Sequence, residues 1–188
     1  MQQKTLYIKN MVCPRCKSVV QTIMQKFGLQ VADIQLGEVE VLADENTNLI
    51  KLNEQLKNEG FELVFDREKQ VIEQIKAYLL EYLDKIEFLN VKLSDYLATK
   101  TDLNYNYLSK IFSNNENITI EKFFILLKIE KVKELLTYKE LSLSEISYQL
   151  AYSSVQALSN QFKTITGLTV SEFKEQANKE RKSLDNLY

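Results

Sequence analysis

Two short segments, Leu143-Ser-Glu-Ile-Ser-Tyr148 and Ala157-Leu-Ser-Asn-Gln-Phe162, repeat an earlier pattern in the same chain. The earlier segments are Leu93-Ser-Asp-Tyr-Leu-Ala98 and Tyr107-Leu-Ser-Lys-Ile-Phe112. Each pair indicates a short helix, a turn and a second helix that reads x-Leu-Ser-x-x-Phe. The long apolar helix expected between the pairs strengthens the match. The pattern predicts a duplicated helix-turn-helix. The alternative is two similar helical hairpins in an all-α bundle.

Helical periodicity continues through the whole region around these pairs. The apolar positions recur every three or four residues, which is typical of amphipathic helices. They predict helices over residues 71–86, 94–99, 104–113, 120–137, 144–150 and 154–164, and a last helix that begins near residue 171. Residues 177–188 are polar, and we expect them to form a frayed tail.

The first third of the chain has a different periodicity. Short β-branched and aromatic runs alternate with helical stripes, and glycines close the elements at Gly28, Gly37 and Gly60. The predicted order is a strand at 4–9, a helix at 16–27, strands at 31–36 and 39–42, a helix at 49–56 and a strand at 61–65. This βαββαβ order is that of the ferredoxin-like arrangement. We therefore expect a ferredoxin-like α+β domain over residues 1–66 and an all-α double helix-turn-helix domain over 67–176.

Composition limits the functions that the chain can have. It holds 188 residues and no histidine, so the usual general base and the commonest metal ligand are both missing. There is also no Gly-rich phosphate loop and no nucleophile beside an evident base, so we do not expect an enzyme. No apolar run reaches the roughly 18 residues of a membrane span. Without an apolar secretory segment at its start, the chain is expected to be cytoplasmic and not to associate with membranes.

The duplicated segments carry a family resemblance. Residues from about 70 to 176 resemble the DNA-binding domain of the AraC/XylS family of bacterial transcription regulators. The likeness lies in Leu141–Tyr152, in Leu158–Phe173 and in the linking helix around Lys128–Leu136. The chain departs from the family where Ala151 precedes an aromatic residue, since the family usually has glycine there. An alanine in a left-handed backbone would cost ~1 kcal/mol.

The resemblance implies that the second helix of each motif reads bases in the major groove of double-stranded DNA. The base-reading positions of the family carry over to Asn106, Ser109, Lys110, Val155, Gln156, Ser159 and Asn160. Lysines can contact phosphates, and we expect Lys100, Lys128 and Lys163 to do so. Residues 67–188 hold 17 Lys/Arg and 17 Asp/Glu, and so lack the basic excess of many DNA binders. Arginine is also scarce, and we therefore expect modest affinity unless the protein forms a homodimer.

The N-terminal region resembles a heavy-metal-associated domain, the fold of copper chaperones. The likeness lies in Met11-Val-Cys-Pro-Arg-Cys16, in Leu36-Gly-Glu-Val-Glu-Val41 and in Gly60-Phe61. The resemblance implies that Cys13 and Cys16 bind a metal. Two soft thiolates without imidazole suit Cu(I) or another thiophilic ion. At the matching position of the family, Met11 is a core residue.

Three interpretations of the cysteine pair are open: metal or thiol sensing, thiol redox chemistry, and a scaffold that serves dimerisation or another ligand. The whole sequence predicts a DNA-binding transcription regulator that responds to a thiophilic metal or to thiol redox state. The alternative is a metal-trafficking or thiol-redox protein whose helical part binds a protein partner. The dependence of DNA affinity on salt would separate these two classes.

Overall fold

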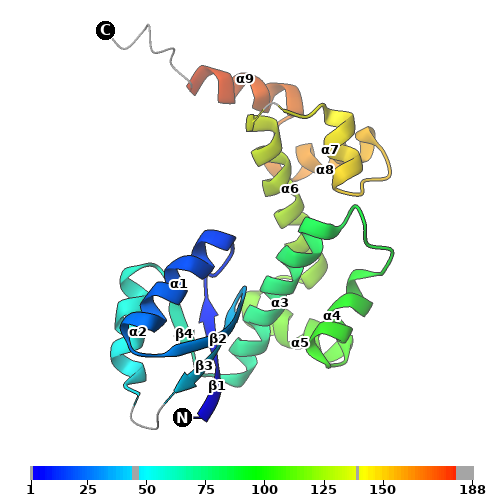
Figure 1. Cartoon of the computed structure of the whole chain (residues 1–188). Coiled ribbons are helices and arrows are strands. Elements are labelled where there is room, and N and C mark those ends of the chain that lie inside the picture. The colour runs from blue at the N-terminus through cyan, green and yellow to red at the C-terminus, as the bar shows by residue number, and fades with distance from the viewer. Residues whose placement is uncertain (1, 44–46, 139, 181–188) are drawn as a thin grey trace, which may run out of the picture. The chain divides into compact units, whose positions relative to one another are not determined.

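The computed structural model describes residues 2–43, 47–138 and 140–180 (Figure 1). The contacts between Cα atoms divide the chain into two compact units. The first unit comprises residues 1–82 and 91–117, and the second comprises residues 83–90 and 118–188. None of the helices in the described ranges combines the length and the apolar composition that a membrane crossing needs.

A four-stranded antiparallel sheet forms the centre of the first unit. Its strands are β1 (Gln2–Lys9), β2 (Gln30–Gln35), β3 (Glu38–Ala43) and β4 (Glu62–Val64). They lie in the order β2-β3-β1-β4, with Leu6 opposite Val39 and Ile8 opposite Leu63. The element order βαββαβ agrees with the sequence prediction. Its assignment to the ferredoxin-like fold stays a prediction.

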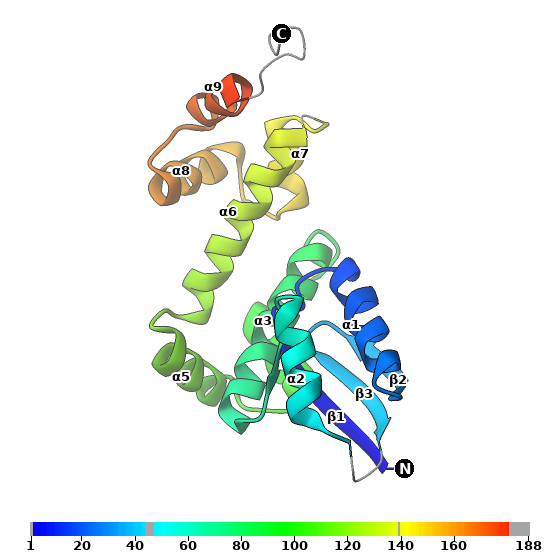
Figure 2. The ribbon, with the colours of Figure 1, turned by 90° about the vertical axis from the view of Figure 1, so that its left-hand side faces the viewer.

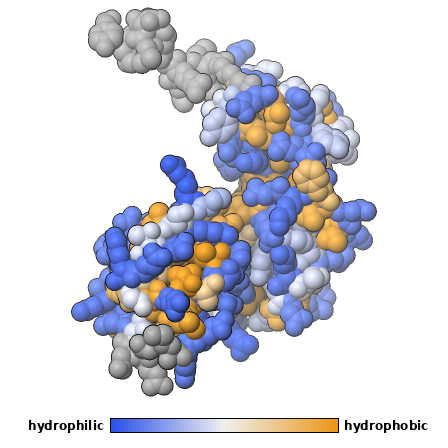
Figure 3. Space-filling view, viewed as in Figure 1, coloured by the Kyte–Doolittle hydropathy of each residue, from blue (hydrophilic) through white to orange (hydrophobic). Residues whose placement is uncertain are grey.

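Two helices cover one face of this sheet, α1 (Pro14–Lys26) and α2 (Leu49–Asn58) (Figure 2). Alternate strand residues point to opposite faces, and the inward set of β3 is Val39, Val41 and Ala43. These side chains form one core with Met24 of α1 and with Leu52 and Leu56 of α2. On the visible surface of this unit, an apolar area lies among hydrophilic side chains (Figure 3).

The helix α3 (Arg67–Lys85) approaches the other face of the sheet. The amide of Gln74 donates to the carboxylate of Glu38 at 3.3 Å, and Glu38 lies on the face opposite to Val39. A Cβ atom placed on Gly37 would lie 3.4 Å from the Cβ atom of Ala77. The turn between β2 and β3 therefore approaches α3 closely at Gly37, which has no side chain.

The remaining helices carry the two helix-turn-helix motifs. The first unit contains α4 (Leu93–Thr101) and α5 (Tyr105–Glu116). The second contains α6 (Ile120–Tyr138), α7 (Leu143–Gln149), α8 (Val155–Thr166) and α9 (Val170–Glu180). In the second unit α6 contacts α7, α8 and α9. The short–long helix pairs that the repeat predicts are thus present, α4 with α5 and α7 with α8.

The C-terminal end differs from the prediction. The helix α9 continues to Glu180, so residues 177–180 of the expected frayed tail are helical. The sequence there has no proline or glycine that would stop a helix, and polarity alone does not end one. Residues 181–188 lie outside the described ranges.

Candidate nucleic-acid interface

The first motif presents α5 with one buried face and one exposed face. Leu108, Ile111 and Phe112 are buried, which fixes the rotation of the helix about its axis. The Asn104 side chain begins the helix by accepting from the N–H of Asn106 at 2.9 Å. The candidate base-reading residues lie on the opposite side, where Asn106 and Lys110 are exposed and Ser109 is half-buried.

The second motif is built in the same way. Leu158 and Phe162 are the buried side chains of α8. The hydroxyl of Ser154 caps the helix by accepting from the N–H of Ala157 at 3.1 Å. The candidate base-reading residues of this helix, Val155, Gln156, Ser159 and Asn160, are exposed or half-buried. Within each unit the predicted residues therefore share one side of one helix.

Two of these residues are already hydrogen-bonded to each other. Gln156 Nε2 donates to Asn160 Oδ1 at 2.7 Å, one helical turn away. This bond orders both side chains on the exposed face. It leaves the Gln156 carbonyl oxygen as an acceptor and the Asn160 side-chain N–H groups as donors. An adjacent acceptor and donor are the groups that amide side chains use against the N6 and N7 atoms of adenine.

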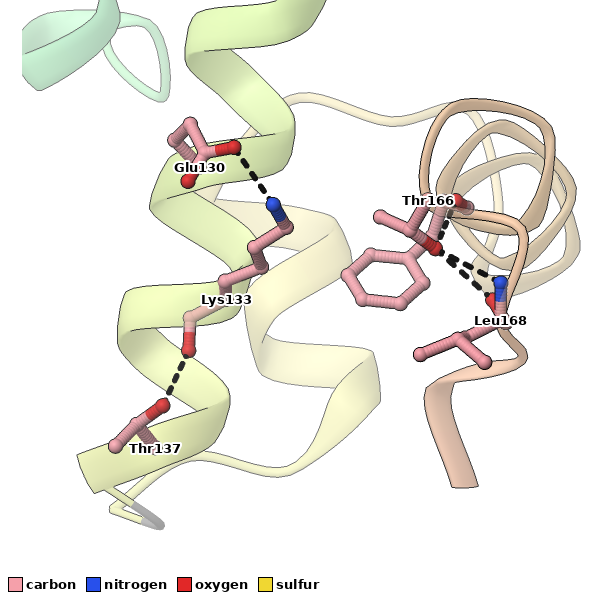
Figure 4. Close-up of polar contacts among 6 residues, drawn as sticks. Glu130, Lys133, Thr137, Thr166 and Leu168 are labelled. Atoms are coloured by element: carbon pink, nitrogen blue, oxygen red, sulfur yellow. Dashed lines mark hydrogen bonds and ion pairs between the residues drawn. The ribbon is translucent and has the colours of Figure 1, made fainter. Parts of the chain in front are cut away.

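The C-terminal end of α8 is closed by a hydroxyl (Figure 4). Thr166 Oγ1 donates to the carbonyl of Phe162 at 2.8 Å and accepts from the N–H of Leu168 at 3.2 Å. Gly167 between them has φ 78°, the left-handed conformation that glycine adopts at low cost.

The same view shows Lys133 of α6 paired with Glu130 (Figure 4). Their Nζ and Oε1 atoms are 2.7 Å apart.

The three lysines predicted to contact phosphates lie in different surroundings. Lys163 is exposed on α8. Lys100 is exposed on α4, but its Nζ atom lies 3.1 Å from Glu81, so part of its charge is neutralised. Lys128 is buried, with its Nζ atom 3.6 Å from the centre of the Tyr152 ring. The Lys128 ammonium is thus engaged by an aromatic ring, and its contact with a phosphate stays a prediction.

The cysteine loop lies at the start of α1. Cys13 occupies the N-cap position, Pro14 begins the helix and the Sγ atoms of Cys13 and Cys16 are 3.0 Å apart. The pKa of the Cys13 thiol is lowered, first by the hydrogen bond from the Cys16 thiol and then by the N–H of Cys16. A lowered pKa increases the thiolate fraction, which is the form that binds soft metals and attacks disulfides.

The donors around this loop fit a two-coordinate thiophilic ion better than zinc. In the described part of the chain, no group of three or more Cys, Asp or Glu side chains is placed to hold a metal. Met11, next to the loop, is buried in the core of the sheet unit, as expected from the sequence. A tetrahedral zinc site would need ligands from outside this loop.

Sequence reasoning missed Tyr152, which follows the left-handed residue Ala151. Its hydroxyl donates to Gln161 Oε1 at 2.8 Å, and its ring receives the Lys128 ammonium. The three residues belong to α6, to the turn between α7 and α8, and to α8. Their separation in sequence hides the contact. The only indication was that an aromatic residue stands at this position in the family that the chain resembles.

Comparison with known proteins supports an AraC-type DNA-binding domain in the helical part. A family described as a helix-turn-helix domain matches residues 97–176. Over 80 residues the chain is 31% identical to the Msm operon regulatory protein of Streptococcus mutans. This match covers 43% of the chain and 29% of that relative, so the chain spans less than a third of the relative's length.

Solved structures show the same fold. The C-terminal domain of AraT, a response regulator from Geobacillus stearothermophilus, is similar with a TM-score of 0.50 and 20% identity, over 65% of this chain and 95% of that one. The DNA-binding domain of AdpA, a global transcriptional factor solved with a target DNA, has a TM-score of 0.50 and 16% identity, over 58% and 95%. These two proteins are named as a response regulator and a global transcriptional factor.

Proposed function

We propose that this chain is a sequence-specific DNA-binding transcription regulator. The premise is the AraC-type helix-turn-helix domain at residues 97–176. Double-stranded DNA is its partner and the cytoplasm is its location. The observation that carries the proposal is that both motifs expose the predicted base-reading side of their second helix. The alternative of two hairpins in a bundle would require these sides to be covered by apolar packing.

The residues on these sides have the chemistry of base readers. On α8, the bonded pair of Gln156 and Asn160 presents an acceptor and a donor that suit adenine. On α5, Asn106 suits adenine and Lys110 suits the O6 and N7 atoms of guanine. Val155 can contact the methyl group of thymine. The set favours sites that contain A·T pairs, while phosphate contacts from Lys163 and Lys100 would position the helices without selecting a sequence.

The test begins with selection of binding sites by the full chain from a random pool of DNA duplexes. For the best site, the dissociation constant is measured against salt and compared with that of scrambled DNA. A sequence-specific binder loses affinity steeply as salt rises and prefers its site by about a thousandfold or more. Failure to enrich any sequence, with no salt dependence, would favour the alternative of a thiol or metal-trafficking protein whose helices bind a protein partner.

Single substitutions then identify the readers. Asn106→Ala and Gln156→Ala should each weaken binding to the selected site by ~1–3 kcal/mol. Gln25→Ala is a matched control, because Gln25 is exposed on α1 outside the matched domain. If both variants bind the selected site as tightly as the unchanged protein does, other residues read the DNA.

We also propose that the sheet unit is a ferredoxin-like, heavy-metal-associated-type sensor that responds through Cys13 and Cys16. The observation that favours this second function is the 3.0 Å approach of two sulfur atoms at a helix N-terminus. There the helix dipole and the Cys16 N–H stabilise a thiolate. A bound Cu(I) or other thiophilic ion would supply a fixed positive charge and a link between the two sulfurs. Oxidation of the pair would supply the same link as a disulfide.

The helix α3 makes contacts both with the sheet and with the first motif. Gln74 of α3 bonds to Glu38 of β3, and Lys76, two residues further along α3, pairs with Glu116 at the end of α5 at 2.8 Å. An effector regulates DNA binding only if it favours one arrangement over another. These contacts are where such a preference would pass. A homodimer would add a second set of DNA contacts, which would offset the lack of a basic excess in residues 67–188 of one chain.

The sensor proposal has its own experiment. The Cys13→Ser, Cys16→Ser double variant and the unchanged protein are compared for binding to the selected site in chelator, with Cu(I) under reducing conditions, and with a thiol oxidant in chelator. The variant should match the unchanged protein in chelator and should lose the response to Cu(I) or to oxidant. A response that persists in the double variant would exclude these thiols as the sensor.

A further inference from the structure

Lys128 is the only charged side chain among the buried residues of the described structure, with 9% of its surface exposed. Its ammonium makes no ion pair with a carboxylate of the described residues and lies over the Tyr152 ring instead. Burying a cation away from water costs free energy, and an aromatic face offsets part of that cost. Burial also lowers the pKa of Lys128 to about 8. A lysine in this position therefore has a cost that a neutral side chain of similar size would avoid.

Tyr152 connects this lysine to the recognition helix of the second motif. The Tyr152 hydroxyl donates to Gln161 Oε1 at 2.8 Å, and Gln161 lies on α8, one residue after Asn160. The Tyr152 backbone N–H donates to the Ser147 carbonyl at the end of α7. The tyrosine is thus bound at three points: its ring to α6, its backbone to α7 and its hydroxyl to α8. These three helices all belong to the second unit.

We propose that Lys128 is a positioning residue for DNA recognition: its contact with the Tyr152 ring fixes the tyrosine, whose hydroxyl sets the orientation of α8 through Gln161. This inference rests on the proposed function, because it concerns the side chains that α8 presents to DNA. It replaces the phosphate contact that the sequence suggested for Lys128.

The role predicts opposite effects on stability and on recognition. Replacement of a buried charge by an apolar side chain of similar volume is often neutral or stabilising. Lys128→Met should therefore leave the melting temperature unchanged or raised. The same variant frees the Tyr152 ring and should weaken binding to the selected DNA by about tenfold. Affinity for scrambled DNA, which depends on phosphate contacts, should change little.

Two further variants make the comparison sharp. Lys128→Arg keeps a cation that can lie over an aromatic ring and should restore most of the specific affinity. Lys131→Met is the matched control, because Lys131 lies on the same helix and pairs with Glu134 at 2.9 Å instead of contacting the tyrosine. It should bind the selected site as the unchanged protein does. A role of Lys128 in packing alone would make stability and affinity fall together.

A double-mutant cycle tests the connection itself. Lys128 and Gln161 are linked through Tyr152, so Lys128→Met and Gln161→Ala should be non-additive in specific DNA affinity. Tyr152→Phe, which keeps the ring and removes the hydroxyl, should abolish this coupling. Additive effects in the cycle, or unchanged specific affinity of Lys128→Met, would overturn the inference. If the unchanged protein selects no DNA site, the proposed function fails instead.

Discussion

Tyr152 donates its backbone N–H to the carbonyl oxygen of Ser147 at 2.9 Å, which closes the C-terminal end of α7. Ala151, between them, donates to the carbonyl of Tyr148 at 2.9 Å. These two bonds form a Schellman motif, which requires a left-handed residue at its turn. The helices α1 and α2 end in the same bond pattern and use Gly28 and Gly60 at that position. Only α7 of these three helices places an alanine there, with φ 49°.

Ala151→Gly should therefore stabilise the second unit. A residue with a Cβ atom pays ~1 kcal/mol in this conformation, whereas glycine does not. We expect the free energy of unfolding to rise by about this amount, reduced by the larger backbone entropy of glycine in the unfolded chain. Chemical denaturation of the full chain measures the change. Lower stability of the glycine variant would mean that the alanine is not strained.

The contrast between Ala151 and Tyr152 shows how far the sequence leads. Local pattern predicts the helices and the turn, because each depends on neighbours within a few positions, whereas only the family resemblance points to a left-handed residue at Ala151. The contact of the Lys128 ammonium with the Tyr152 ring depends on how α6 packs against α7 and α8. The hydropathy pattern does not predict this packing. The sequence predicts a phosphate contact for Lys128, yet this residue is buried with its ammonium over an aromatic ring.

The sheet unit shows the same limit. The βαββαβ order follows from alternating and helical periodicities, and the strand ends differ from those expected by one or two residues. The contact of α3 with the sheet through Gly37 was not predictable, because the glycine was explained by its turn alone. Nor does the sequence reveal that the sheet and the first helix-turn-helix motif belong to one compact unit.

The stability of the protein should depend on the charge of Lys128 in alkaline solution. Burial lowers the pKa of this group from 10.5 to about 8, so between these values the unfolded chain binds more protons than the folded one. The free energy of unfolding contributed by this group therefore rises as pH increases through 8 and levels off above 10.5. Comparison of Lys128→Met with the unchanged protein at pH 7 and pH 10 isolates this contribution. The difference between their free energies of unfolding should be smaller at pH 10 than at pH 7. An equal difference at both pH values would contradict the burial of a charged lysine.

The N-terminal ends of α7 and α9 should weaken in acid. The Glu145 carboxylate accepts from the Ser142 N–H at 2.7 Å, and the Glu172 carboxylate accepts from the Thr169 N–H at 2.7 Å. These bonds lower the pKa of Glu145, through Ser142, and of Glu172, through the Thr169 backbone. A lowered folded pKa gives stability that is present above the usual value of 4.5 and is lost as pH falls through the folded value. Melting temperatures of Glu145→Gln and of the unchanged protein should therefore converge in acid.

The ion pair between Lys76 of α3 and Glu116 of α5 can be tested by its effect on stability. Lys76 Nζ lies 3.1 Å from Glu73 and 2.8 Å from Glu116, and all three side chains are partly buried. Burial acts to lower the pKa of Lys76, but the bonds and charges of Glu116 and Glu73 raise it. Lys76→Met leaves two carboxylates without their shared cation and should destabilise the protein by about 1 kcal/mol. Glu116→Gln in the same background should recover part of this loss, because it removes one of the two unpaired charges.

The Lys76→Met variant also tests whether the contact between α3 and α5 has a regulatory role. If the path from Glu38 through α3 to α5 carries the response of the cysteine loop, Lys76→Met should reduce the ratio of DNA affinities with and without Cu(I). Specific binding in chelator should change little, because Lys76 lies on α3 and is not one of the predicted base-reading residues. Lys57→Met is the control, since Lys57 forms an ion pair with Glu62 at 2.8 Å within the sheet. An unchanged ratio in Lys76→Met would show that any signal from the thiols reaches the DNA-binding helices by another route.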